Sequence, residues 1–258
     1  MFISDKFIFN GIHSDEMSVA LVTFDSEIFN KYGLEFNQEV SLSKGGKDMS
    51  HFIEGDVDIK EIELNIALID ENDSPIAWDD DTLIDVTNWL ITDSFVEFIS
   101  EDNVDLVYYF KTTKIVKNFT HDKKGYLQVT FQPFSNSAYK KFIKKYTFNN
   151  PGSFTVNNVS YLREMYKPVI EIKNLSDKSN VISIENETLA DKPFVIQDLD
   201  NNELVKIDGL LGTVYNENND NLLMKCNRKW LQLTRGKNKI NVSGDVEICI
   251  KCQFPTMM

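Results

Sequence analysis

The residues in this sequence with the greatest capacity for chemistry are cysteines, histidines and carboxylates. Of the three cysteines, Cys249 and Cys252 have the C-x-x-C spacing of metal and redox sites, and Cys226 stands alone. The surrounding run Val246–Phe254 alternates apolar and polar residues, which predicts a strand. Positions three apart on a strand point to opposite faces, so the two sulfurs cannot easily share a ligand. We therefore predict ordinary reduced thiols, with no metal and no cofactor.

The three histidines and the many carboxylates lack the spacings that catalytic sites use. His13, His51 and His121 form no H-x-x-x-H or similar ligand pattern. Glu61 and Glu63 share one face of a predicted strand, whereas glycoside hydrolysis needs two carboxylates that face each other across the substrate. No G-x-S-x-G elbow and no dinucleotide-binding glycine pattern occurs. We interpret the two glutamates as a solvated or interface face and predict a protein that is not an enzyme.

Two further segments look like ligand loops without matching their patterns. Lys44–Asp48, which contains Gly45 and Gly46, lacks the spacing of a phosphate-binding loop, and no helix pattern follows it. A mobile hairpin tip is predicted there instead. The acidic run Asp70–Asp81 lacks the residue order of a calcium loop. Its last three aspartates suit the start of a helix, where carboxylates cap free N–H groups and interact favourably with the helix dipole.

A lysine-rich segment and one tryptophan have binding alternatives. In Ser135–Pro151, four lysines surround Phe142 and Ile143, a mixture that can bind nucleic acid. We interpret this segment as a solvated connector between domains. Trp230 lies in the strand-like run Trp230–Leu233. Its ring suits either a platform for a sugar or packing against the second sheet or the other domain, and packing is the interpretation we favour.

Two regular elements in the first half position many of these residues. Asp56–Asp70 alternates in two phases that meet at Lys60 and Glu61, which indicates either a β-bulge or two strands that meet there. Apolar residues then repeat at helical spacing and predict a helix at about residues 80–91, with an apolar face made by Leu83, Val86, Trp89 and Leu90. The first half is therefore a predicted β domain with one helix that covers a sheet.

Short strand patterns recur from the helix to the end of the chain. Leu106–Phe110 and Lys114–Phe119 are predicted as separate strands, and beyond residue 150 the strand patterns have the spacing of a β-sandwich. The predicted fold class is mainly β. It comprises an N-terminal β-sandwich-like domain with one α-helix over residues 1–145 and a C-terminal β-sandwich over residues 146–258.

Composition narrows the class of protein further. The chain has 258 residues, enough for two ordinary domains, and a formal net charge of -13. That charge argues against a protein that grips nucleic acid by neutralising phosphates, although it is compatible with a surface past which DNA moves without sticking. The N-terminal residues do not have the pattern of a signal peptide, and no apolar run is long enough to predict membrane insertion.

Four groups of short motifs occur in a distinctive order. They are Phe7–Ser14; Asn88–Leu90 with Phe95–Ile99 and Tyr108–Phe110; Val129–Pro133 with Ala138-Tyr139; and Leu231–Leu233 with Gly236–Ile240. The first is similar to F-x-F-N-G-x-x-S and the last to L-x-x-G-x-N-x-I. Together the motifs extend over almost the whole chain, and in this order the chain resembles the distal tail (Dit) proteins of long-tailed, siphovirus-type bacteriophages.

The resemblance implies a structural protein of a phage, a prophage or a tail-like particle. Six copies would form a closed ring in the baseplate at the virion tail tip, after synthesis in the bacterial host cytoplasm. The ring would join the tail tube protein to a tail-associated lysin or fibre protein, and to receptor-binding or baseplate proteins. DNA would pass through its channel without specific binding. The C-terminal domain would be a galectin-like or carbohydrate-module-like sandwich.

On this resemblance, Phe7–Asn10 would help to form a belt between neighbouring subunits, and Gly45–Glu54 would form a protruding arm. The expected subunit-interface residues are Phe7, Phe9, Asn10, Gly45, Gly46, His51, Glu61 and Glu63. Two other classes of function stay open. One is a carbohydrate-binding protein whose C-terminal sandwich recognises host cell-wall sugars, with Trp230 as a glycan contact. The other is a wall-degrading enzyme.

Overall fold

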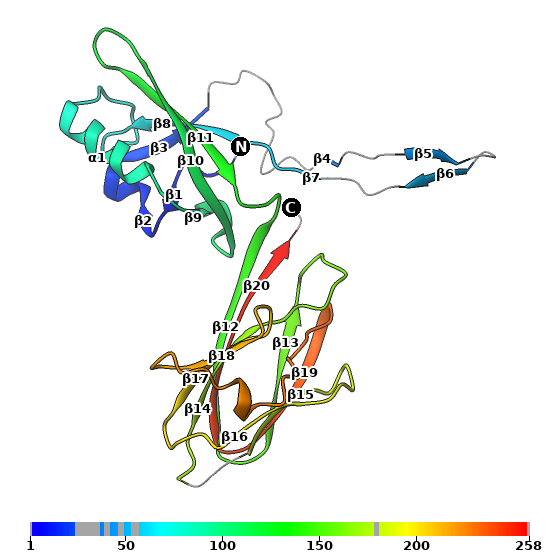
Figure 1. The fold of residues 1–258 in the computed structure, drawn as a ribbon. Helices are drawn as coiled ribbons and strands as arrows, with labels where there is room; N and C mark the ends of the chain where they lie inside the picture. Colours follow the sequence, from blue (N-terminus) through cyan, green and yellow to red (C-terminus); the bar gives the residue numbers. More distant parts are fainter. Residues whose placement is uncertain are drawn as a thin grey trace. The chain divides into compact units, whose positions relative to one another are not determined.

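The structure is a computed structural model that describes residues 2–23, 37–38, 42–45, 49–52, 57–177 and 181–256. The chain divides into two compact units, Met1–Ala138 and Tyr139–Met257. The strands with assigned pairings are antiparallel, and the described residues contain one α-helix, so the prediction of a mainly β protein with a single helix is confirmed (Figure 1).

The first unit is built on sheet strands that pair in the order β10-β11-β8-β3. At the β10 edge, β9 pairs with both β10 and β1, and β1 pairs with β2. These strands are β1 (Phe7–Phe9), β2 (Ile12–His13), β3 (Val19–Val22), β8 (Ile62–Leu68), β9 (Val96–Ser100), β10 (Leu106–Phe119) and β11 (Gly125–Pro133). Two 3-10 turns, η1 (Ser14–Met17) and η2 (Glu101–Asn103), complete the described elements that surround this sheet.

The alternating run Asp56–Asp70 forms two strands rather than one. β7 (Val57–Asp58) pairs with β4 (Asn37–Gln38), whereas β8 pairs with β11 and β3. The phase change at Lys60 and Glu61 lies in the break between β7 and β8, so of the two alternatives the meeting of two strands is confirmed. Between β4 and β7 in the chain, β5 (Leu42–Gly45) pairs with β6 (Met49–Phe52), as a hairpin requires, and residues 46–48 of its predicted tip lie outside the described residues.

β10 is one continuous strand of 14 residues, and the prediction of two separate strands there is wrong. A β-bulge between Thr112 and Lys114 shifts its register against β11. A bulge inserts one residue, so the apolar alternation changes phase without an interruption of the strand. The sequence shows the change of phase, and only the pairing with β11 distinguishes a bulge from a gap.

The helix α1 (Asp80–Leu90) begins and ends close to the predicted limits. The Asp79 carboxylate accepts a hydrogen bond from the Thr82 N–H at 2.8 Å, which caps the first turn. The four residues of the predicted apolar face are buried. Trp89 stacks on Phe7 with ring centroids 5.7 Å apart, and its Nε1 donates to the carbonyl oxygen of Phe9 at 3.0 Å. The helix is therefore fixed to β1 by both packing and a buried hydrogen bond.

The second unit consists of two sheets, in the orders β12-β20-β14-β17-β18 and β13-β19-β15-β16. Buried side chains from both sheets form one core, as in a β-sandwich. The strands are β12 (Ala138–Phe148), β13 (Gly152–Asn158), β14 (Val169–Asn174), β15 (Val181–Asn186), β16 (Phe194–Gln197), β17 (Leu204–Asp208), β18 (Thr213–Asn216), β19 (Gly236–Ser243) and β20 (Val246–Thr256). A 3-10 turn, η3 (Leu223–Lys225), precedes β19.

Two expectations for this part of the chain are wrong. Ser135–Pro151 is not a solvated connector, because it contains β12. The limit between the two units, after Ala138, falls within this segment, and residue 145 lies inside the strand. Phe142, Tyr146 and Phe148 pack against the core, so the aromatic residues of the segment are structural. The run Trp230–Leu233 is not a strand either, and only Leu233 forms an isolated bridge, to Tyr166.

Candidate assembly and binding surfaces

The first motif, Phe7–Ser14, is a folding element of the N-terminal core. Phe7 and Phe9 are 0% exposed, and Asn10 and Gly11 have φ values of 51° and 79°, which suit a two-residue hairpin between β1 and β2. The Ser14 hydroxyl accepts a hydrogen bond from the Phe7 N–H at 3.2 Å. Their own domain therefore already surrounds the side chains of Phe7 and Phe9, and their expected place in an intersubunit belt stays a prediction. Asn10 is the exposed member of that expected belt.

The last motif has a similar explanation in the second unit. Leu233 and Ile240 are 0% exposed in the core, and Gly236 has a φ of 91° at the start of β19. Asn238 is also 0% exposed, and its Oδ1 accepts hydrogen bonds from the N–H of Thr234 at 2.8 Å and from its hydroxyl at 3.1 Å. The motif L-x-x-G-x-N-x-I therefore places two apolar side chains in the core and one buried amide where its hydrogen bonds close the turn.

Glu61 and Glu63 are exposed beside the strands of the N-terminal sheet. A Glu61 carboxylate oxygen accepts a hydrogen bond from the Thr113 hydroxyl at 2.9 Å, and a Glu63 oxygen accepts one from the Gln128 amide at 3.1 Å. Because Thr113 belongs to β10 and Gln128 to β11, both glutamates lie among polar residues that sheet pairing brings together. Their role as interface residues stays a prediction.

The residues expected in the arm are only partly described. Within the ladder of β5 and β6, Gly45 is opposite Met49, and His51 is opposite Ser43. Gly46 lies outside the described residues. The antiparallel ladder fits the predicted hairpin, and the contacts expected of Gly45 and His51 stay predictions.

Three of the histidines and cysteines that suggested chemistry in the sequence, His13, Cys249 and Cys252, have positions that the fold explains. His13 Nδ1 accepts a hydrogen bond from the Asp15 N–H at 3.1 Å, and His13 Nε2 lies 2.8 Å from a Glu101 carboxylate oxygen. Cys249 and Cys252 point to opposite faces of β20, as predicted, and burial raises the pKa of the Cys252 thiol to about 12. Among the described residues, no group of three or more His, Cys, Asp or Glu side chains could hold a metal ion.

Trp230 packs against the C-terminal core. It is half-buried, and its ring stacks on that of Phe194 with centroids 6.1 Å apart and planes 24° apart. Gly209 and Gly212 lie beside it, since a Cβ at Gly209 would lie 3.4 Å from the Trp230 Cβ and one at Gly212 would lie 3.7 Å from the indole ring. Part of the indole surface that a sugar platform needs is therefore covered by the protein itself.

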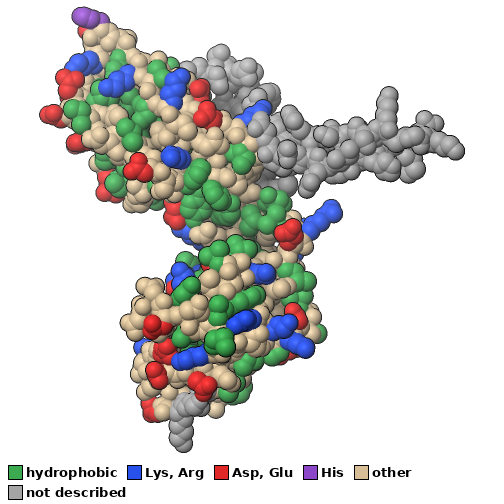
Figure 2. Space-filling view, viewed as in Figure 1, with side chains coloured by type: hydrophobic (Ala, Val, Ile, Leu, Met, Phe, Trp, Pro, Cys, Tyr) green, Lys and Arg blue, Asp and Glu red, His purple; other side chains and the backbone are tan. Residues whose placement is uncertain are grey.

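Charge is divided unequally between the two units. The first unit holds 26 of the 40 acidic and 10 of the 27 basic residues, which gives a formal charge of −16, and the second holds 14 and 17, which gives +3. On the face that Figure 2 shows, Lys and Arg side chains lie among hydrophobic ones over the second unit. Within the first unit, lysines concentrate on the hairpin of β10 and β11, at Lys111, Lys114, Lys117, Lys123 and Lys124.

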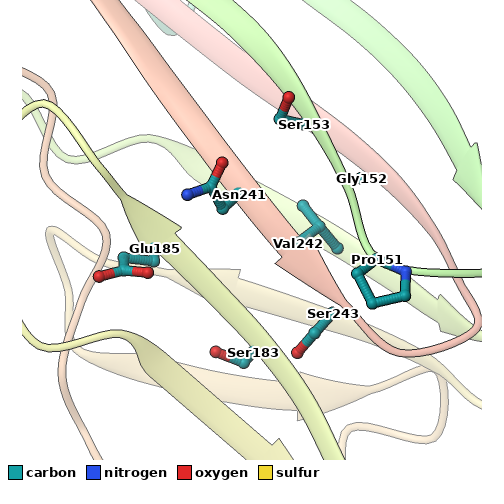
Figure 3. Close-up of a pocket in the computed structure, with 8 residues that line it drawn as sticks. All are labelled: Pro151, Gly152, Ser153, Ser183, Glu185, Asn241, Val242 and Ser243. Carbon is teal, nitrogen blue, oxygen red and sulfur yellow. The ribbon is translucent and has the colours of Figure 1, made fainter.

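A polar hollow that sequence reasoning missed lies on the outer face of the sheet β13-β19-β15 (Figure 3). Its volume is about 370 Å³, and its polar lining comes from Ser153, Ser183, Glu185, Asn241 and Ser243. In the sequence these residues are scattered over 91 positions among many other serines and asparagines, so no local signal distinguishes them. They come together only through strand pairing.

Comparison with known proteins identifies the family. The chain matches a family model described as a phage tail protein N-terminal domain over residues 2–135, and one described as a phage tail C-terminal domain over residues 137–252. It therefore belongs to this family of phage tail proteins. Within the described residues, no helix is long and apolar enough to cross a membrane.

Particular relatives agree with this assignment. The SPbeta prophage-derived protein YomH of Bacillus subtilis (strain 168) is 22% identical over 256 residues, which cover 97% of each chain. Among solved structures, the Dit protein (gp 19.1) of phage SPP1 matches with a TM-score of 0.60 and 13% identity, over 96% of this chain and 98% of that one. A chain of the phage P2 baseplate in its activated conformation with Ca matches with a TM-score of 0.53 and 11% identity, over 97% and 98%. The resemblance to distal tail proteins is confirmed, and at these identities the structural likeness shows a shared fold.

Proposed function

We propose that this chain is a distal tail protein that forms a closed hexameric ring at the tail tip and has no catalytic activity. The ring joins the tail tube protein to the tail-associated lysin or fibre protein and to baseplate proteins. The observation that carries the proposal is the likeness to SPP1 Dit, which extends over 96% of this chain and so includes both units. A match over one unit alone would support a shared module, whereas a match over both supports a shared role.

The charge of the first unit supports its placement around a DNA channel. A unit with a formal charge of −16 repels phosphates at short range, so DNA can move past it without being retained. A basic lining would have the opposite effect, because it would release counterions and bind the DNA. The N-terminal unit therefore suits the channel side of the ring, and the C-terminal unit suits the contacts with other tail proteins.

Ring closure requires each copy to present two different complementary surfaces. In the first unit, the exposed residues Lys114 on β10 and Glu63 on β8 lie in one row of the sheet, because both are opposite Thr130 on β11. This face therefore carries charges of both signs. We place one contact between neighbouring copies at this face and the other at the hairpin of β5 and β6.

The mass of the purified protein in solution tests this proposal. A ring of six 29.8 kDa chains has a mass of about 180 kDa, which multi-angle light scattering separates clearly from a monomer. We expect the fraction of protein in this species to increase with protein concentration, and we expect the species to appear as rings in negative stain. A protein that stays monomeric at every concentration, and also when mixed with its tail tube protein, would contradict the hexamer.

A further inference from the structure

The polar hollow on the second unit has a rigid floor set by the core beneath it. Ile184 and Val242, which alternate with the lining residues along β15 and β19, are 1% and 2% exposed in the sandwich core. Gly152 also borders the hollow, and because it is opposite Val242, a Cβ there would lie on the core face of β13, 2.5 Å from the Phe148 ring. A larger residue at this position would therefore displace Phe148 and disturb the floor.

Strand register places the polar groups of the hollow in two adjacent rows. Asn241 on β19 is opposite Ser153 on β13 and also opposite Glu185 on β15. In the next row, Ser183 is opposite Ser243. Directly opposed residues in a sheet have Cβ atoms about 5 Å apart on one face. Three hydroxyls, one amide and one carboxylate therefore lie on the same face of β13, β19 and β15, where they line the hollow (Figure 3).

Most of this hydrogen-bonding capacity is unused within the chain. The Asn241 amide nitrogen donates to a Glu187 carboxylate oxygen at 3.0 Å, which leaves its carbonyl oxygen as an acceptor. None of the residues that the structure describes hydrogen-bonds to the side chains of Ser153, Ser183, Glu185 or Ser243. The hollow therefore offers both donors and acceptors to a ligand.

The composition of the lining selects among ligand classes. The carboxylate of Glu185 disfavours phosphates and other anions, whereas that of Glu187 is paired with the Lys239 ammonium at 2.8 Å. One carboxylate with neutral hydroxyls falls short of the oxygen ligands that a divalent cation needs, and a large apolar ligand would leave the polar groups without partners. A neutral ligand rich in hydroxyl groups satisfies all five side chains, because each hydroxyl both donates and accepts.

We propose that this hollow is a binding site for a neutral saccharide. Glu185 and the Asn241 carbonyl oxygen accept hydrogen bonds from sugar hydroxyls, and the three serines complete the network. Pro151, at the rim, supplies an apolar surface for the sugar ring. This location differs from Trp230, whose ring is engaged with Phe194.

Isothermal titration calorimetry on the full-length protein tests the site with chitotetraose, cellotetraose and maltotetraose as probes. We expect one of these neutral tetrasaccharides to bind with millimolar affinity, and we expect Glu185→Gln and Asn241→Ala each to weaken binding by about tenfold. Asn157→Ala is the matched control, because Asn157 is an exposed asparagine of the same face that does not line the hollow. This control should bind as the wild type does.

Two outcomes would overturn the proposal. One is that none of the three probes releases or absorbs heat at a probe concentration about ten times a millimolar Kd. The other is binding that Trp230→Phe abolishes and Glu185→Gln leaves intact, which would move the site to Trp230. Melting temperatures check that each variant folds. Light scattering on the same samples reports ring assembly, so a failure of saccharide binding and a failure of the hexamer are distinguished.

Discussion

The buried amide of Asn238 should be one of the main determinants of stability in the second unit. Its Nδ2 donates to the carbonyl oxygens of Thr234 at 2.7 Å and Gly236 at 2.9 Å, and its Oδ1 accepts from the Thr234 N–H at 2.8 Å. Its Oδ1 also accepts from the Asn186 amide at 2.9 Å, and Asn186 in turn donates to the Gln232 carbonyl oxygen at 2.7 Å. Two asparagines thus hold the segment 232–236 against β15 and β19.

The substitution Asn238→Ala removes the four bonds that Asn238 itself makes and leaves the Thr234 N–H without its partner. With about 1 kcal/mol for each of three net hydrogen bonds and 1–3 kcal/mol for the Thr234 N–H left unpaired, we expect a loss of about 4–6 kcal/mol in the free energy of unfolding. For a unit of this size, that loss lowers the Tm by about 16–24 °C. Differential scanning calorimetry measures the shift, and Asn157→Ala, on an exposed site of β13, should change stability by less than about 0.5 kcal/mol.

A second variant separates the loss of hydrogen bonds from the loss of volume. Asn238→Asp keeps the acceptor for Thr234 but removes the donors and buries a carboxyl group. Burial raises the pKa of such a carboxyl, so this variant should be least stable at neutral pH and should recover as the pH falls and the group becomes protonated. A loss below about 1 kcal/mol for Asn238→Ala, or no pH dependence for Asn238→Asp, would refute the assignment of the turn to this amide.

Four further predictions follow from the first unit and from β20. Gly125→Ala should destabilise the protein far more than Gly11→Ala, measured by chemical denaturation, because a Cβ at Gly125 would lie 2.0 Å from the Asn118 carbonyl oxygen, whereas one at Gly11 meets no described atom within 4 Å. Because the hydrogen bond from the Thr82 N–H lowers the pKa of Asp79, the ionised carboxylate stabilises the folded protein at pH values above its ordinary pKa of 3.8. This stabilisation is lost as the pH falls through the lower pKa of Asp79 in the folded state. Asp79→Asn keeps the hydrogen bond and should remove this pH dependence from thermal melts. Because burial raises the pKa of Cys252, its thiol should react with a disulfide reagent only after unfolding, and Cys252→Ser should leave the count of fast-reacting thiols unchanged. Deletion of Gly45–Glu54 should weaken the ring in light scattering while circular dichroism stays unchanged, and an equally stable ring would exclude the arm from assembly.

The sequence by itself determined several local elements, because the residue pattern that specifies each of them lies within a few consecutive residues. Helix α1 was predictable because its four apolar residues repeat at helical spacing and Asp79 caps it. The hairpin at Asn10 and Gly11 was predictable because those residue types accept a positive φ. The opposite directions of Cys249 and Cys252 follow from strand alternation alone, and that alternation excluded a shared ligand.

Only the tertiary structure decided which residues meet across strands and which surfaces remain exposed. Phe7 and Phe9 were expected at an interface, but the packing of β1 against α1 and β9 buries both. The bulge in β10 is visible only against β11. The hollow around Glu185 and Asn241 exists because β13, β19 and β15 pair in one particular register. A shift of one residue would turn these polar groups into the core, and a single chain segment contains no information about the register of its neighbours.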